Sequence, residues 1–253
     1  MKSQLPESST VRKMKGEIPA SPSLSKLEAL QQTPWFSLLE RSSQQLILNE
    51  SKELEVEAGS FVLRAGDSPV GWFSVLEGLL KWSAIAEDGR SVSMAGFSPG
   101  SWFGEASLVR GEPYDYHAIA LRKSRVLIVP QSTCHQLFRE QIAFSNAVMR
   151  QLAERVNYFM GTFSAQILSN MEVKIAQTLA SMFNKELHPR RQPHLGITQE
   201  ELANLCGVSR QRCNLVLNRF ARSGMLTIEY AGITVIDLER LRSFSGPKRV
   251  SPK

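Results

Sequence analysis

The sequence predicts an α+β protein with an N-terminal antiparallel β-roll of the jelly-roll type, a long helix and a C-terminal winged helix-turn-helix. The β-roll prediction rests on short alternating runs punctuated by glycine from Glu53 to Val129, a pattern typical of many short antiparallel strands. The long helix is predicted from a proline-free segment with helical periodicity over residues 141–169. The last part is predicted from two capped helical segments and a β-hairpin pattern over residues 197–236.

Composition places the chain among ordinary water-soluble proteins. Of its 253 residues, 42% are apolar and 21% are charged, which suffices for two domains that each bury a core. No apolar run approaches the ~18 residues of a membrane span, and the N-terminus lacks the apolar core of a secretion signal. We therefore expect a cytoplasmic protein. Cys134, Cys206 and Cys213 form no close-spaced pair, which favours reduced thiols over disulfides or a zinc site.

The N-terminal half begins with a tail and continues into the strands. Residues 1–25 are rich in Ser, Lys and Pro and show no periodicity, which predicts a mobile tail. Residues 27–51 are expected to be helical. The clearest of the following strands are Ser60–Leu63, Trp72–Leu76, Leu80–Ala84 and Val92–Phe97. A barrel of this kind can enclose a small ligand.

The long helix has an apolar stripe whose members recur at alternating three- and four-residue steps. Two helices with such a heptad seam can pair as a coiled coil. We therefore predict a homodimer whose interface contains Met149, Leu152, Val156, Phe159 and Phe163. The alternative is a helix that uses this stripe for the core of its own subunit.

Two short helices joined by a tight turn are predicted next. Thr198 and Glu201 form a capping box at the start of the first helix, and Gly207 permits the left-handed turn that ends it. Ser209 caps the second helix. Apolar spacing predicts that the buried side of this second helix consists of Cys213, Val216, Leu217 and Phe220.

The opposite face of the second helix carries Arg210, Gln211, Arg212 and Asn214, residue types that contact base edges and phosphates from a major groove. Charge supports this interpretation independently. Residues 171–253 contain thirteen Lys and Arg against seven Asp and Glu, a surplus of six that equals the net charge of the whole chain. Such a basic segment beside a neutral one is typical of nucleic-acid binding. An ordinary helical hairpin with a solvated polar face is the alternative.

Two further segments complete the C-terminal part. Thr227–Tyr230 and Ile233–Ile236 flank a glycine turn and predict a hairpin, the wing. Upstream, His188–His194 is expected to be a solvated basic loop, because its prolines and the lack of partner cysteines or acids disfavour a metal site. No Ser/His/Asp or Cys/His arrangement and no phosphate-binding loop is present in the sequence, so we do not expect an enzyme.

Several glycine motifs of the strand-rich region are specific in combination: Ala58-Gly59, Leu63–Asp67, Leu76-Glu77-Gly78, Asp88-Gly89-Arg90 and Phe97–Glu105. Together with the winged helix, they make the chain from about Leu27 to Phe244 resemble the CRP/FNR family of bacterial transcription regulators. The resemblance implies an allosteric, sequence-specific regulator that binds palindromic double-stranded DNA as a homodimer. It also implies RNA polymerase as a partner, and no membrane.

The resemblance also sets the expected domain boundaries. They are a mobile tail at 1–25, an effector-sensing β-roll domain at 26–140, and a dimerisation helix with its hinge at 141–170. A winged helix-turn-helix domain at 171–246 and a basic tail at 247–253 follow. The hinge itself is expected at Asn170-Met171.

In cyclic-nucleotide binders of this family, a glutamate accepts the ribose hydroxyl and an arginine neutralises the cyclic phosphate. Glu105 matches the glutamate, but the arginine position falls on Tyr114, and Asp115 follows it. A phenol and an anion make a phosphate site electrostatically unfavourable. The two residues that would face adenine become Phe159 and Met160. We therefore predict that cyclic AMP is not the effector.

Other effectors of the family are also disfavoured. An iron–sulfur cluster needs several N-terminal cysteines, and none precedes Cys134. His117 or the Cys134-His135 pair could ligate haem, but adjacent helical residues point in different directions. An aromatic cavity for a small organic effector remains, with candidate residues Trp102, Gly104, Glu105, Tyr114, Asp115, Tyr116 and Phe159. The alternatives are a regulator with a purely structural β-roll and a ligand-binding scaffold with a vestigial DNA domain.

The DNA-facing helix departs from the family as well. The family's frequent pattern is Arg-Glu followed four residues later by Arg; here Arg210 matches, while Gln211 and Leu215 replace the other two. Glutamine prefers adenine, whereas glutamate accepts from cytosine, so we expect an operator unlike the family's common half-sites. The expected DNA contacts are Thr198, Gln199, Ser209, Arg210, Gln211, Arg212, Asn214 and Arg219, with Ser209 and Arg219 on phosphates.

Overall fold

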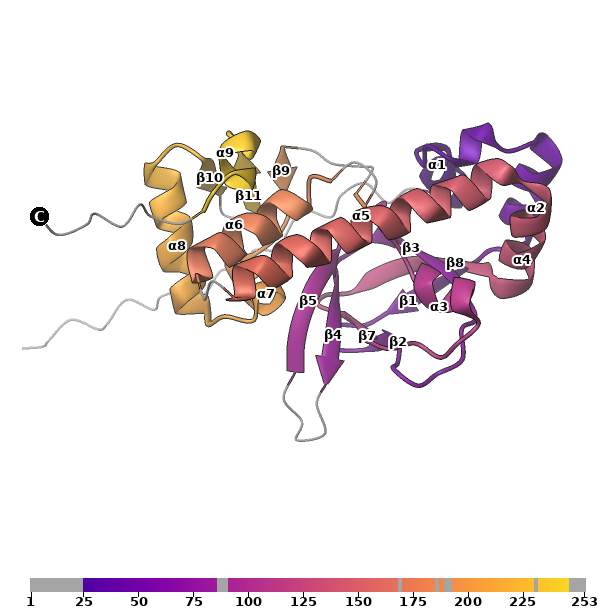
Figure 1. Ribbon diagram of the computed structural model, residues 1–253, viewed down its shortest axis with the longest axis horizontal. Coiled ribbons are helices and arrows are strands. Elements are labelled where there is room, and N and C mark those ends of the chain that lie inside the picture. Colours follow the sequence, from indigo (N-terminus) through magenta and orange to yellow (C-terminus); the bar gives the residue numbers. More distant parts are fainter. Residues whose placement is uncertain are drawn as a thin grey trace, which may run out of the picture.

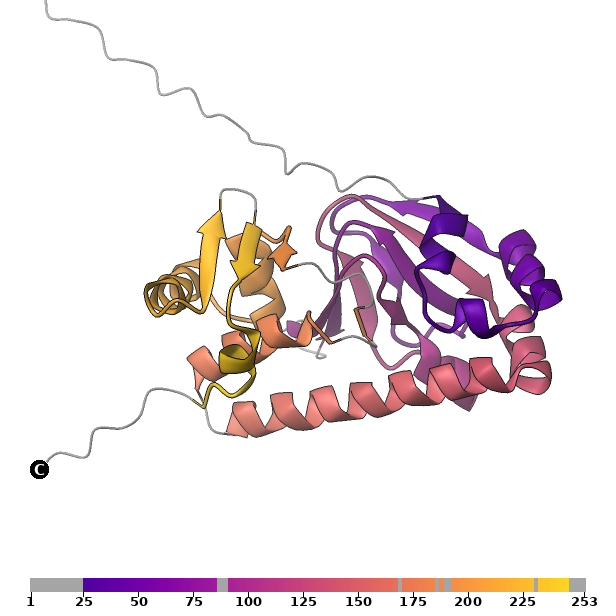
Figure 2. The same cartoon turned by 90° about the horizontal axis from the view of Figure 1, so that it is seen from above.

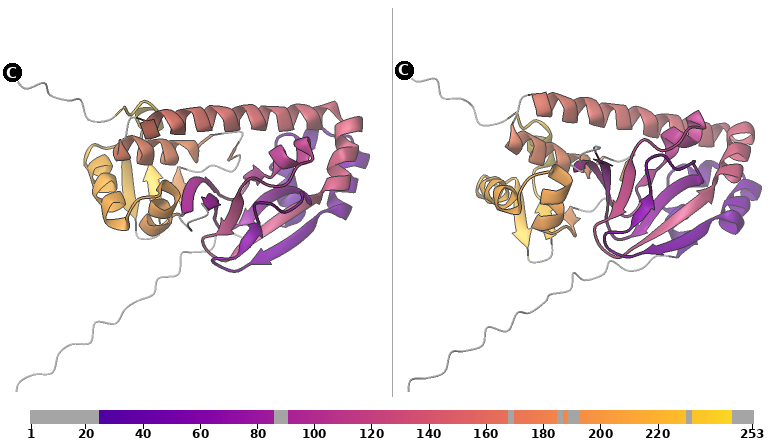
Figure 3. Two further views of the ribbon diagram at one scale, coloured as in Figure 1. Left: turned by 60° about the horizontal axis from the view of Figure 1, so that its bottom comes forward. Right: turned by 90° about the horizontal axis from the view of Figure 1, so that it is seen from below.

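A computed structural model describes residues 25–85, 91–167, 170–184, 187–188, 193–229 and 232–245. The helix α5 (Ile142–Ile167) extends past two domains, with an antiparallel β-roll near its first half and a smaller helical domain near its end (Figure 1). Both domains lie on the same side of α5 (Figures 2 and 3). The predicted α+β class is confirmed. Both predicted tails lie outside the described residues, except for Ser25.

The N-terminal region folds into three short helices, as expected: α1 (Lys26–Gln31), the 3₁₀ helix η1 (Phe36–Leu38) and α2 (Arg41–Glu50). Trp35 stacks on Trp72 with ring centroids 5.3 Å apart and meets Trp102 edge-on at 5.2 Å. Phe144 of α5 packs against Trp35 and Trp72 from another direction. This aromatic cluster fixes the N-terminal helices and α5 to the same side of the β-roll.

Two four-stranded antiparallel sheets, ordered β1-β8-β3-β6 and β2-β7-β4-β5, form the β-roll. Phe73, Phe97 and Phe103 stack in its core, and all three side chains are buried. The helix α3 (Glu105–Arg110) follows β6. The strands are β1 (Lys52–Val56), β2 (Phe61–Leu63), β3 (Gly71–Glu77), β4 (Leu80–Ile85), β5 (Ser91–Phe97), β6 (Trp102–Phe103), β7 (His117–Ala120) and β8 (Ser124–Pro130).

The chain leaves the β-roll through α4 (Gln131–Glu140) and turns into α5 at Gln141, whose backbone is extended. Phe144 and Val148 of α5 are buried against the roll. The predicted helix at 141–169 thus corresponds to α5, and its last two residues lie outside the described ones. Asn170, the expected hinge, caps the next helix by accepting the N–H groups of Glu172 and Val173.

The C-terminal domain is a winged helix-turn-helix. Its helices are α6 (Met171–Ser181), α7 (Gln199–Cys206), α8 (Arg210–Arg222) and α9 (Leu238–Arg242), and its sheet has β9 (His194–Leu195), β10 (Leu226–Glu229) and β11 (Gly232–Val235) in the order β10-β11-β9. The predicted capping box of Thr198 and Glu201 is present, and Gly207 has φ 59°, in the left-handed region. Tyr230 and Ala231, within the predicted hairpin, lie outside the described residues.

The β-roll docks directly on the helix-turn-helix. Leu79, from the turn between β3 and β4, is buried within the core cluster of the winged helix domain. Gly96 of β5 lies so close to α7 that an added Cβ would stand 2.7 Å from Leu205 Cδ1. The two domains therefore share a packed interface in addition to α5.

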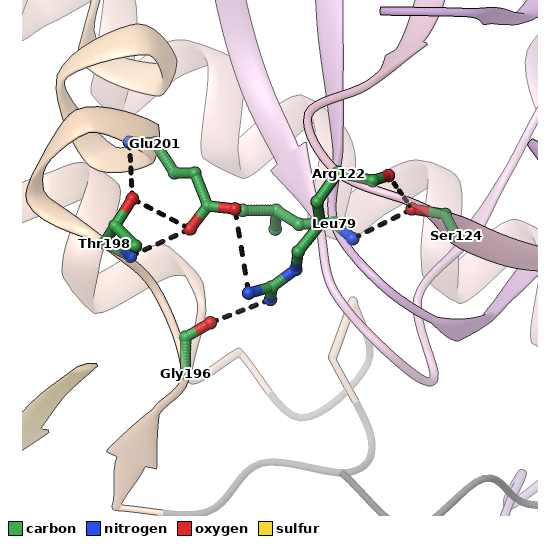
Figure 4. A network of polar contacts seen from close by, with 6 residues as sticks. All are labelled: Leu79, Arg122, Ser124, Gly196, Thr198 and Glu201. Atoms are coloured by element: carbon green, nitrogen blue, oxygen red, sulfur yellow. Dashed lines mark hydrogen bonds and ion pairs between the residues drawn. The ribbon is translucent and has the colours of Figure 1, made fainter. Parts of the chain in front are cut away.

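A polar network flanks this interface (Figure 4). The Arg122 guanidinium donates to the Gly196 carbonyl over 2.8 Å and lies 3.6 Å from Glu201 Oε1. The other carboxylate oxygen of Glu201 closes the capping box with Thr198. The same glutamate thus starts the first helix of the helix-turn-helix and ties it to the β-roll.

Candidate nucleic-acid interface and effector pocket

The second helix of the pair, α8, separates an apolar face from a polar one. Its buried residues are the four predicted from spacing: Cys213, Val216, Leu217 and Phe220. On the outer face lies a surface groove of about 710 Å³ lined by Arg210, Gln211, Asn214, Leu215, Asn218, Arg219 and Arg222. The groove carries three guanidinium groups and three amides, so it is suited to phosphates and base edges.

Several predicted DNA contacts are already engaged with neighbours in the groove. Asn214 donates to Gln199 Oε1 over 2.6 Å. Arg210 lies 3.9 Å from a Glu200 carboxylate oxygen, and the Arg219 guanidinium pairs with Glu172 of α6. DNA therefore has to displace these partners, and its phosphates can replace the carboxylates of Glu200 and Glu172 through charge-assisted hydrogen bonds.

Two predicted contacts serve as helix caps. The Thr198 hydroxyl accepts the Glu201 N–H, and Ser209 Oγ accepts the Arg212 N–H. The side chains of Gln211 and Arg212 are exposed and make no hydrogen bond or ion pair within the part of the chain that the structure describes. These two side chains are thus the most available for DNA.

Glu105 lies at the first position of α3 and is buried, with only 3% of its surface exposed. Its Oε1 accepts a hydrogen bond from Arg155 Nε of α5 over 3.0 Å. The same guanidinium donates to the Trp102 carbonyl over 2.8 Å, and Gln151, one turn earlier, donates to that carbonyl over 2.9 Å. Glu105 is therefore paired with Arg155, an arginine of the same chain.

Aromatic rings enclose this ion pair. The Arg155 guanidinium lies 5.3 Å from the ring centroids of both Trp82 and Phe97, within cation–π distance. Trp82 also packs edge-on against Phe159 at 4.7 Å. Glu105 Oε2 and Trp82 Nε1 are both buried and have no hydrogen-bond partner among the described residues.

The two predicted cavity tyrosines are structural. Tyr116 OH accepts the Gly104 N–H over 3.0 Å, and Tyr114 OH accepts the Val70 N–H over 3.1 Å. Desolvation raises the pKa of Tyr116 strongly, with a further contribution from Glu105, and burial also raises the pKa of Tyr114. Both phenols therefore stay protonated at neutral pH.

The structure corrects two members of the predicted cavity. The Trp102 ring lies among Trp35 and Trp72, so only its carbonyl reaches Arg155. The Asp115 side chain is exposed and pairs with Arg110 over 2.7 Å. Trp102 precedes Phe103 of the roll core and Asp115 follows the buried Tyr114, and successive side chains along an extended segment point to opposite faces.

Sequence reasoning missed Arg155. The residue lies on the buried side of α5 with Val148, Gln151 and Leu152, where a charge interrupts the apolar pattern. A lone arginine with a polar residue four positions earlier on an apolar helix face signals a buried partner, because an unpaired charge there is costly.

His188 was expected in a solvated loop, and this was wrong. The side chain is buried, with its Nδ1 atom 2.7 Å from Ser101 Oγ and 2.9 Å from Ser98 Oγ of the β-roll. Burial, and then the charge of Arg155, lower the pKa of His188 from 6.5 to about 3. His188 is therefore neutral and belongs to the interface between the domains. Residues 189–192 of the predicted loop lie outside the described ones.

The other candidate ligating side chains have separate environments. His117 Nδ1 accepts the Ala65 N–H over 3.2 Å, His194 contacts Thr234, and His135 is exposed. Burial raises the pKa of the Cys134 thiol to about 12. Within the described residues, no group of three His, Cys, Asp or Glu side chains could hold a metal ion.

Along α5, an apolar stripe faces away from the subunit. Its members are between 58% and 80% exposed: Ile142, Met149, Val156, Met160 and Phe163. Leu152 and Phe159, also predicted for the dimer interface, turn toward their own subunit, where Leu152 packs on the aromatic cluster and Phe159 on Trp82. Leu152 and Phe159 each follow an outward residue, Met149 or Val156, by three positions, which places them about 60° around the helix, on the side of their own subunit.

A β-roll joined to a winged helix-turn-helix whose second helix exposes an arginine- and amide-lined groove defines a DNA-binding transcription regulator. Sequence comparison agrees: residues 53–141 match the cyclic nucleotide-binding domain family, and residues 173–244 match the Crp-like helix-turn-helix domain family. The chain belongs to the CRP/FNR family of transcription regulators. No helix within the described residues is long and apolar enough to span a bilayer.

Two relatives represent differently named regulators of this family. The chain is 24% identical over 218 residues to a CRP-like cAMP-activated global transcriptional regulator of Mycobacterium tuberculosis, covering 85% of this chain and 97% of the relative. It is 22% identical over 219 residues to the fumarate and nitrate reduction regulatory protein of Vibrio cholerae, covering 85% and 87%.

Solved structures share the fold. FixK2 from Bradyrhizobium japonicum superposes with a TM-score of 0.63 at 15% identity, covering 78% of this chain and 98% of FixK2. The c-di-GMP responsive global regulator CLP of Xanthomonas campestris gives a TM-score of 0.55 at 20% identity, covering 78% and 99%.

Proposed function

We propose that this protein is a homodimeric, sequence-specific regulator that binds palindromic double-stranded DNA. The observation that carries the proposal is the two-faced helix α8, whose apolar side is buried while its guanidinium and amide side chains line an open groove. A chain of this kind acts in the cytoplasm, where the chromosome is, and activation would involve contact with RNA polymerase.

The exposed stripe on α5 supports the dimer. Met149, Val156, Met160 and Phe163 are each at least 58% exposed in the single chain, and such a continuous apolar stripe on a long helix fits a second copy of itself. A two-fold axis along α5 would place two α8 helices to enter successive major grooves, ~34 Å apart, of a palindrome.

The polar side chains of α8 divide into two roles. Arg210, Gln211 and Arg212 lie in the first turn, the part of a recognition helix that reaches base edges; Gln211 pairs best with adenine. Arg219 and Arg222 lie in the last turn and are placed for phosphates, which set register without reading sequence.

The effector is not cyclic AMP on this proposal. Tyr114 stands where the resemblance would require the arginine that binds the phosphate, and Arg155 already satisfies one oxygen of Glu105. A nucleotide would have to displace a buried ion pair, which leaves a charge unpaired in a low-dielectric site.

The same ion pair supports a second candidate, a regulator whose β-roll is structural and needs no effector. Against it stand the buried Glu105 Oε2 and Trp82 Nε1, each without a hydrogen-bond partner among the described residues, which a small polar effector could satisfy. Thermal shift assays with cyclic AMP and with small polar organic molecules distinguish the two, because a ligand at about 100-fold over its dissociation constant stabilises by about 2.7 kcal/mol.

A mobility-shift titration tests DNA binding. The duplex would come from the region upstream of the protein's own gene. The salt concentration would be varied, since the logarithm of the binding constant falls linearly with the logarithm of the salt concentration when a protein contacts phosphates. Arg210→Ala and Arg212→Ala should each cost about 1–3 kcal/mol of operator affinity. Arg110→Ala, an exposed arginine of the β-roll, is the matched control. No shift at low salt would contradict the proposal and favour a ligand-binding scaffold with a vestigial DNA domain.

A further inference from the structure

We propose that Leu215 reads the 5-methyl group of a thymine in each half-site, one helical turn beyond the base that Gln211 contacts. This inference rests on the proposed DNA-binding function and names a specificity determinant of that site. It concerns a residue at the position where the family's frequent pattern has an arginine.

The side chain of Leu215 is directed away from the core of its own domain. It is 62% exposed, and it belongs to none of the three hydrophobic clusters formed by the described residues. At 100° per residue, Leu215 lies about 150° around α8 from the centre of the buried face. Removing its side chain therefore leaves the packing of α8 intact.

Polar side chains surround Leu215 on this face. Gln211 lies one turn before it, and Asn218, Arg219 and Arg222 follow one to two turns later; all line the same groove. A single exposed leucine on a protein surface is ordinary, but this one lies in the middle of the surface that faces the base edges. It would lose its contact with water whenever α8 enters the major groove.

The chemistry of the major groove leaves one apolar feature for such a side chain. Guanine, cytosine and adenine present only donors and acceptors there, whereas thymine also presents a methyl group. A leucine cannot hydrogen-bond to a base or pair with a phosphate. It therefore favours thymine, whose methyl group needs no polar partner. It disfavours a G·C pair, because it would leave the polar atoms of that pair without a partner.

The neighbouring contacts fix the register. Gln211 and Leu215 are four residues apart, a rise of about 6 Å along the helix, so they reach base pairs within about two steps of each other on the 3.4 Å spacing of one strand. Asn214 is held by Gln199 over 2.6 Å, which leaves Leu215 as the next side chain of the groove after Gln211. Both then favour A·T pairs, with Gln211 on adenine and Leu215 on thymine.

The test removes only the methyl group. The full-length protein would select its site from a random duplex library at low salt, and each thymine of that site would then be replaced singly by deoxyuridine. For the wild type, one such replacement should raise the dissociation constant about fourfold, the equivalent of one buried methyl group. Replacing it in both half-sites should raise it about fifteenfold. The Leu215→Ala variant should bind both duplexes equally.

Two further variants sharpen the result. Ile236→Ala removes an equally exposed apolar side chain of the same domain, 61% exposed but outside α8, and should retain the full deoxyuridine effect. Leu215→Arg should shift the selected base at that position toward guanine, which offers two acceptors to a guanidinium.

The inference is overturned if no thymine in the selected site is sensitive, or if Leu215→Ala keeps the sensitivity of the wild type. Failure to bind any duplex at low salt would instead overturn the proposed function itself.

Discussion

Arg155 and Glu105 are 50 residues apart in the sequence, yet the guanidinium Nε and the carboxylate Oε1 lie 3.0 Å apart, and both side chains are buried. The pair joins the middle of α5 to the start of α3. It places the positive charge of the long helix beside the glutamate that the family resemblance assigns to effector binding. The interior of the β-roll is thereby coupled to the helix that we propose as the dimer interface.

Removing one partner of this pair should destabilise the protein strongly. Arg155→Met or Glu105→Leu alone leaves a buried, unpaired charge, which costs about 3–5 kcal/mol. The double variant removes both charges and should be much less destabilised than the sum of the two. Urea denaturation of the wild type, the two single variants and the double variant measures the coupling energy between the two side chains.

The control for this prediction is an exposed ion pair. Arg110→Ala, which breaks the exposed pair with Asp115, should cost at most about 1 kcal/mol. Single variants no worse than this control would contradict the prediction.

The protein should lose stability as the pH falls, because His188 is neutral when folded and takes up a proton when the chain unfolds. Its folded pKa, about 3, lies below its ordinary value of 6.5, so the unfolded chain binds a proton in this range that the folded chain does not. The contribution of His188 is therefore complete above pH 6.5 and lost as the pH falls toward 3, with a slope of up to about 1.4 kcal/mol per pH unit. Denaturation between pH 7.5 and 4.5 would show a shallower dependence for His188→Gln. Equal slopes in the two proteins would refute this role.

The exposed stripe of α5 should control the oligomeric state. Met149 and Val156 are 58% and 60% exposed in the single chain, so Met149→Lys with Val156→Lys should leave the subunit folded. Two facing pairs of lysines would oppose pairing through burial of charge. Sedimentation should show a monomer, and operator affinity should fall with it. Leu38→Lys, a substitution at an exposed residue (61%) outside α5, is the control. A double variant that still sediments as a dimer would rule out this interface.

The contact between β5 and α7 should be sensitive to a single methyl group. A Cβ at Gly96 would stand 2.7 Å from Leu205 Cδ1, so Gly96→Ala overpacks the interface at a cost of about 1–3 kcal/mol. Shortening the partner with Leu205→Val should restore part of the loss. Hydrogen exchange of α7 would report the loosened docking directly.

A glycine without close neighbours provides the comparison for this variant. No atom lies within 4 Å of a Cβ added at Gly161 of α5, so Gly161→Ala should be neutral or stabilise by up to about 1 kcal/mol. The same response at Gly96 and Gly161 would show that Leu205 is not in the way.

Arg122 couples the two domains through a second route. Its guanidinium holds the Gly196 carbonyl and Glu201, and Glu201 in turn caps α7. Arg122→Ala should increase exchange at the start of α7, where its two contacts lie, and should leave the far end of α8 protected, because neither contact reaches that end. Uniformly raised exchange across α7 and α8 would speak against a local role.

The sequence by itself determined the features whose causes lie within three or four residues. The capping box of Thr198 and Glu201, the left-handed Gly207 and the buried face of α8 were all predictable, because the chain alone sets capping, backbone freedom and helical spacing. The family resemblance added the β-roll and the order of the parts. It also pointed to Glu105 and to the missing arginine at Tyr114.

Only the tertiary structure decided which side chains meet across long separations. Arg155 on Glu105, His188 on Ser101 and Leu205 on Gly96 depend on how the β-roll, α5 and the winged helix pack, and no local pattern encodes those distances. The misplaced residues have the same origin: Trp102 packs among Trp35 and Trp72 and Asp115 pairs with Arg110, contacts that the local sequence does not reveal. The residue pattern predicted most of the helices and strands. Burial against distant partners decided which side chains meet, because the free energy of burying a charge or a ring depends on what lies opposite it.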